Sequence, residues 1–83
     1  MTEGEELVRT WQEITARIRP LLAGHSPMAQ GAVLADLVAM FFAGHHPKRR
    51  AMLMEGWMST VNGLMAVYDK ENMPDGWPEQ TVQ

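Results

Sequence analysis

The sequence predicts an all-α fold, a bundle of three helices that run up, down and up before a short irregular tail. The segment at residues 23–27 (AGHSP) recurs almost unchanged at 43–47 (AGHHP). A glycine just past a helix end can take the left-handed conformation, and proline suits the first turn of a helix, so each copy predicts a joint between two helices. Apolar residues at helical spacing flank both joints. We therefore expect a three-helix domain over residues 1–71 and a turn with a polar tail over 72–83.

The first helix is expected over residues 4–23, where apolar side chains recur on one face within an arc of roughly 100°. Pro20 lies inside this pattern and deletes one backbone hydrogen bond. The stripe continues in phase beyond it, which favours a kink over a helix end. The stripe consists of Leu7, Trp11, Ile14, Ile18, Leu21 and Leu22.

The second helix is expected to begin at Pro27, with Ser26 as its N-cap, and to end at Phe42 or Ala43. Asp36 is its only charged residue. A helix that is apolar nearly all round is stable only when it is buried. Two other helices of the same chain cover two of its sides, so we expect a second subunit to cover the rest.

The third helix is expected from Pro47, with His46 as its cap, to about Lys70. Its apolar stripe, from Leu53 to Tyr68, spans roughly 140°, more than one neighbouring helix requires. Glycines on the flank cost helix stability, which suggests a close helix contact there. Beyond this helix, residues 74–76 fit a type I turn, and the following tryptophan could anchor the tail.

These wide apolar faces predict a homodimer that forms through the second and third helices, because large exposed apolar patches are usually covered. Small residues would allow close approach of the two backbones, and larger apolar residues would pack beside them. The expected interface comprises Gly31, Ala35, Ala39, Phe42, Gly56, Trp57, Met58 and Gly63.

The composition narrows the class of protein. At 83 residues the chain is expected to be a single domain, and it has no cysteine for a disulfide, a thiolate metal site or a cysteine nucleophile. Its start is acidic, and no apolar run reaches the roughly 20 residues of a membrane span. The net charge of −3 argues against general affinity for nucleic acid. We therefore expect a cytoplasmic protein with no membrane contact and no cofactor.

The three histidines, His25, His45 and His46, all lie in the repeated joints. Histidine is a common metal ligand and a general acid or base near neutral pH. The two joints flank a helix of about 17 residues and are therefore about 25 Å apart within one chain. We expect these side chains to cap helix ends, with an intersubunit ligand or metal site as the alternative if two second helices pack antiparallel.

Lys48, Arg49 and Arg50 place three cations in the first turn of the third helix, where the helix dipole favours anions. We expect the acidic start of the first helix (Glu3, Glu5 and Glu6) to offset them, with anion or nucleic-acid contact as the alternative. A helix-turn-helix DNA-binding unit is not favoured, because the second helix is too long and the third is a core helix.

The sequence contains no constellation typical of catalysis, neither a glycine-rich phosphate loop nor a nucleophile elbow. We expect a non-enzymatic helical homodimer that acts as a protein-interaction adaptor or regulator. Two alternatives remain open: a ligand- or metal-binding protein with the intersubunit histidine site, and a nucleic-acid-binding regulator that uses the basic start of the third helix.

Overall fold

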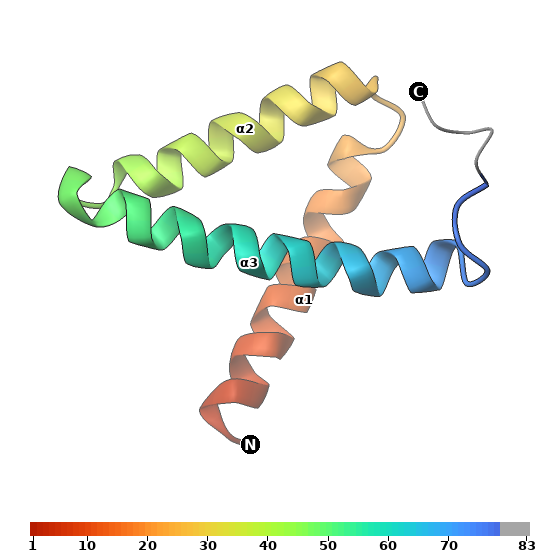
Figure 1. Ribbon diagram of the computed structural model, residues 1–83, viewed down its shortest axis with the longest axis horizontal. Helices are drawn as coiled ribbons and strands as arrows, with labels where there is room; N and C mark the ends of the chain where they lie inside the picture. Colours follow the sequence, from red (N-terminus) through yellow and green to blue (C-terminus); the bar gives the residue numbers. More distant parts are fainter. Residues whose placement is uncertain (79–83) are drawn as a thin grey trace. The chain divides into compact units, whose positions relative to one another are not determined.

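The computed structural model describes residues 1–78, which form three α-helices and no strand (Figure 1). The helices are α1 (Glu3–Leu22), α2 (Pro27–Ala43) and α3 (Pro47–Asn72). This confirms the predicted all-helical fold and places each helix within two residues of its expected bounds. The predicted polar tail includes residues 79–83, which lie outside the described residues. The up-down-up order stays a prediction, because the chain divides into two compact units, Met1–Val38 and Ala39–Gln83, which are described separately.

Helix α1 begins one residue earlier than the sequence pattern predicts, because Thr2 caps it. The Thr2 hydroxyl accepts a hydrogen bond from the backbone N–H of Glu5 at 3.1 Å. Acidic residues fill the first turn, where they complement the positive end of the helix dipole. Pro20 lies inside the helix and does not end it. The prediction that the helix continues past the proline is therefore confirmed.

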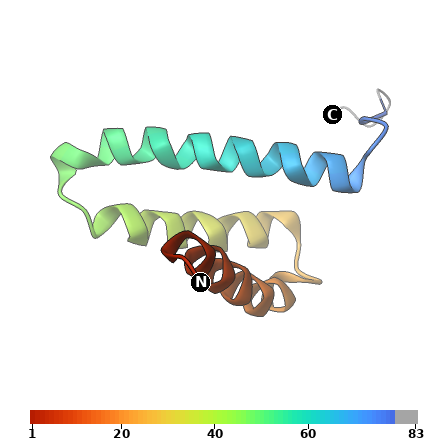
Figure 2. The same ribbon diagram turned by 90° about the horizontal axis from the view of Figure 1, so that it is seen from below.

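Helices α2 and α3 begin as the joints predict, each with proline at its first residue. The Ser26 hydroxyl accepts a hydrogen bond from the N–H of Ala29 at 3.2 Å. The imidazole Nδ1 of His46 accepts one from the N–H of Lys48 at 3.1 Å. Both side chains therefore satisfy backbone donors that have no partner inside a helix. Figure 2 shows α2 and α3 joined by a short connection.

The two joints differ at their glycines, only one of which takes the left-handed conformation that glycine allows. Gly24 has a φ of 83°, whereas Gly44 is not among the described residues with positive φ. The second connection is one residue shorter, because α2 continues to Ala43 while α1 stops at Leu22. The N–H of Gly44 still donates to Met40 O, four residues back, at 3.2 Å. Gly44 therefore continues the helical hydrogen-bond pattern and needs no left-handed turn.

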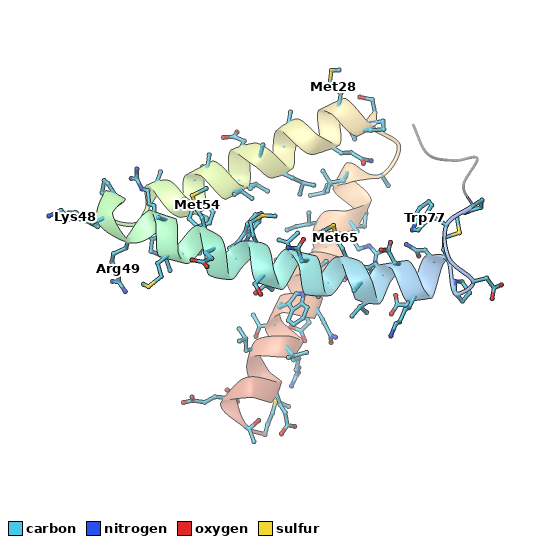
Figure 3. The ribbon with its side chains drawn as sticks, viewed as in Figure 1. Met28, Lys48, Arg49, Met54, Met65 and Trp77 are labelled. Carbon is cyan, nitrogen blue, oxygen red and sulfur yellow. The ribbon has the colours of Figure 1, made fainter. Side chains whose placement is uncertain are left out.

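The residues after α3 form the predicted turn, and the residue that follows the turn contacts α3. The N–H of Gly76 donates to Met73 O at 2.9 Å, which closes a four-residue turn. The indole N–H of Trp77 then donates to a carboxylate oxygen of Asp69 at 3.1 Å (Figure 3). Trp77 thus anchors this segment on the last turns of α3, while more than half of its side chain stays exposed.

Phe42, at the end of α2, is the only buried residue among those described, with 8% of its surface exposed. Its ring lies edge to face with the ring of Trp57 on α3, with centroids 5.9 Å apart. The neighbouring Phe41 ring also lies edge to face with the Phe42 ring, with centroids 5.1 Å apart. Aromatic pairs favour this arrangement. This cluster is therefore the packing centre of the unit that begins at Ala39.

We predict that Phe42→Ala lowers the free energy of unfolding by about 3 kcal/mol or more, because it removes a buried aromatic ring. Phe41→Ala is the matched control, since 51% of that side chain is already exposed. Urea unfolding followed by circular dichroism measures both variants. Equal losses of stability in the two variants would contradict this account of the cluster.

Candidate functional site

The joint between α2 and α3 is held by the side chain of Arg50. Its Nε donates to Phe42 O and to His45 O, each at 3.0 Å. Its Nη2 donates to Ala43 O at 3.4 Å. These carbonyls lie at or just beyond the end of α2, where acceptors have no donor within the helix. Phe42 O also accepts from the backbone N–H of His45 at 3.0 Å, so Arg50 is a second donor to it. The guanidinium of α3 therefore caps α2, and its charge sits at the negative end of the α2 dipole.

The joint between α1 and α2 has an equivalent contact, made by Gln30. Its side-chain amide donates to Leu22 O at 2.8 Å and to His25 O at 3.1 Å. Gln30 and its two acceptors each lie twenty positions before Arg50 and its acceptors, so the repeat extends to the residue three positions after each proline. We call each of these interactions a corner clamp. The sequence analysis missed both clamps, although extending the repeat comparison past the prolines would have shown a long polar side chain at both positions.

Arg50 differs in its surroundings from the other two residues of the expected basic cluster. It is half-buried, and its Nε and Nη2 donate to backbone carbonyls. Lys48 and Arg49 are exposed and project away from α3 (Figure 3). Any contact with an anion or nucleic acid at this helix start would therefore depend on Lys48 and Arg49. The expected pairing of the cluster with Glu3, Glu5 and Glu6 stays a prediction.

Two of the three histidines take up helix-end roles. Nδ1 of His45 lies 2.8 Å from Phe41 O, and its ring packs edge to face on Phe41 with centroids 4.9 Å apart. His46 caps α3 through Nδ1, as described above. The His25 ring is exposed and has no hydrogen bond among residues 1–78. No group of three potential ligands among these residues could hold a metal ion, and an intersubunit site stays a prediction.

The expected interface residues fall into two groups. Phe42 and Trp57 pack on each other within the chain, so Phe42 is buried before any second subunit binds. A Cβ added at Gly31, Gly56 or Gly63 would meet no atom within 4 Å. Within its own unit, each of these glycines therefore has open space beside it, and the close helix contact suggested by Gly56 and Gly63 stays a prediction. The remaining expected interface residues, Ala35, Ala39 and Met58, are exposed.

A cavity of about 210 Å³ lies at the first corner, between the end of α1 and the start of α2. Its lining is mostly apolar, with His25 and Gln30 as the polar contributors. The residues that line it are Ile18, Leu21, Leu22, His25, Ala29, Gln30 and Val33.

No helix in the described part of the chain is both long enough and apolar enough to cross a membrane. Comparisons with known protein families, curated proteins and solved structures gave no match to this chain.

We predict that Arg50→Met lowers the free energy of unfolding by about 1 to 3 kcal/mol, because it removes the charged side-chain donor from three carbonyls, of which Phe42 O keeps the backbone N–H of His45. Arg49→Met is the matched control, since it removes the same charge from an exposed side chain in the same helical turn. Urea unfolding measures both variants. The clamp would have no energetic importance if the two variants unfolded at the same urea concentration.

Proposed function

We propose that this chain is a non-enzymatic helical homodimer that acts as a protein-interaction adaptor or regulator. The observation that carries the proposal is the exposure of large apolar side chains on α2 and on α3, each helix taken by itself. On α2, Leu34 and Leu37 each expose 47% of their surface and Phe41 exposes 51%. On α3, Met58 and Met65 expose 45% and 50%. Apolar exposure on this scale is typical of a surface that binds another protein.

The proposal commits to a second copy of this chain as the partner. A second copy is the occupant we favour, because symmetric pairing is the commonest way for a soluble chain to cover such a surface.

The glycines of α3 indicate where the second copy would approach. Gly56 and Gly63 lie on the same flank of the helix, seven residues apart. Each costs about 0.5 to 1 kcal/mol relative to alanine, and nothing in the unit that begins at Ala39 lies within 4 Å of a Cβ added at either one. A second helix packed closely on this flank would offset that cost. Exposed methionines beside it, such as Met52, can adapt to the facing surface.

We predict that Gly63→Leu weakens dimer formation while the subunit stays helical. The added side chain has open space in the single chain and leucine favours the helix, so folding is unimpaired. In the dimer the same side chain would hold the two backbones apart. Sedimentation equilibrium at micromolar concentration measures association, and circular dichroism checks helix content.

Asn62→Leu is the matched control, because it adds leucine one position away on a different face of α3. It should dimerise as the parent does. A parent protein that sediments as a monomer would refute the proposed function. A dimer that tolerates Gly63→Leu and Asn62→Leu equally would show that the second copy binds elsewhere.

A further inference from the structure

The two corners of the chain share the clamp but differ in the residues around it. The clamped carbonyl belongs to Leu22 at the first corner and to Phe42 at the second. The residue before it is Leu21 in one case and Phe41 in the other. Equivalent positions therefore carry leucines at the first corner and phenylalanines at the second. The second corner serves as a guide to how a ring could sit at the first.

At the second corner aromatic rings occupy these positions. The Phe41 ring lies edge to face against His45, with centroids 4.9 Å apart. The Phe42 ring is buried and packs edge to face with Trp57. At the first corner, the smaller Leu21 and Leu22 line a cavity of about 210 Å³ beside His25. No aromatic ring packs on the His25 imidazole among the described residues.

The polar groups at this cavity are available to a ligand. The NH₂ group of Gln30 is held by Leu22 O and His25 O, so its carbonyl oxygen is left without a partner among residues 1–78. The His25 imidazole likewise has no hydrogen bond within those residues. An amide oxygen accepts a hydrogen bond, and an imidazole can donate or accept one. The clamp therefore leaves one acceptor unused on Gln30, a residue that lines the mostly apolar pocket.

We infer that the α1–α2 corner binds a small aromatic molecule that carries one hydroxyl or N–H group, in the class of simple phenols and indoles. The pocket is open to solvent, since Leu21 and Val33 expose 73% and 47% of their surfaces, and its volume of about 210 Å³ is sufficient for one ring. The ring would pack on the leucines and edge to face with His25, as Phe41 does with His45. The hydroxyl or N–H would donate to the Gln30 carbonyl oxygen. This inference does not depend on dimer formation.

Phenol titrated into the full-length protein tests this site, followed by ¹H–¹⁵N NMR. We expect saturable shifts of the Gln30 side-chain amide and of the backbone amides of Leu21 and Ala29. Toluene has a similar shape but no hydroxyl, and cyclohexanol has the hydroxyl but no aromatic ring. Each should bind about tenfold more weakly than phenol, because each loses one of the two interactions. Equal affinity for all three molecules would overturn the assignment.

Leu21→Phe copies the second corner into the first and should abolish the phenol-induced shifts by placing a ring beside His25. Leu7→Phe is the matched control, because it makes the same change at an exposed position of α1 outside the cavity lining. Val33→Phe fills the cavity from the α2 side. It replaces Leu21→Phe as the cavity-filling variant if Leu21→Phe loses its helical circular dichroism.

The aromatic ring in this pocket could belong to a free small molecule or to a side chain of a second copy, and the variants distinguish the two. Loss of phenol binding in the cavity-filling variants, with binding retained in Leu7→Phe, supports a site for a free molecule. Absence of shifts at millimolar phenol in the parent overturns it, and so does unchanged binding in both Leu21→Phe and Val33→Phe. A parent that binds no phenol but loses self-association on Leu21→Phe would show that a side chain of a second copy fills the cavity instead.

Discussion

The helices of this chain depend on how their C-terminal carbonyls are satisfied at the two corners. The last four carbonyls of a helix have no backbone donor within it, and a helix of 17 residues such as α2 is only marginally stable alone. Gln30 reaches back from the following helix to two carbonyls and Arg50 to three, at distances between 2.8 and 3.4 Å. Each clamp therefore ends one helix and fixes the start of the next with the same side chain.

Hydrophobic packing adds less to the single chain than its composition would allow. Apolar residues make up 46% of the sequence, yet Phe42 is the only buried residue among those described. Burial of apolar surface is the main favourable term in folding, at roughly 25 cal/mol per Å². The apolar side chains exposed on α2 and α3 thus contribute little to the stability of the single chain, and burying them would increase it. In the proposed dimer, a second copy would cover those faces, so assembly would also stabilise the fold.

The sequence predicts the helices well because their start signals are local. Ser26, His46 and the prolines after them act on backbone groups within three residues, so the pattern alone locates the starts of α2 and α3. The turn at residues 73–76 is local in the same sense. The corner clamps escaped prediction because they join residues five to eight positions apart across a bend. The conformation of Gly44 could not be read from the repeat either, because the second connection is one residue shorter than the first and Gly44 continues the helical hydrogen-bond pattern.

The second corner also shows why a basic cluster in a sequence need not bind an anion. A cation in the first turn of a helix is unfavourable with respect to that helix. At a tight corner, however, the same position lies beside the negative end of the preceding helix, and Arg50 donates to its carbonyls. Gln30 makes the equivalent contacts with a neutral amide, which keeps the first corner uncharged. The guanidinium adds charge-assisted hydrogen bonds where phenylalanines fill the corner, whereas the amide leaves an unused acceptor where leucines leave it open. The same type of clamp thus occurs beside a buried phenylalanine at the second corner and beside an open pocket at the first.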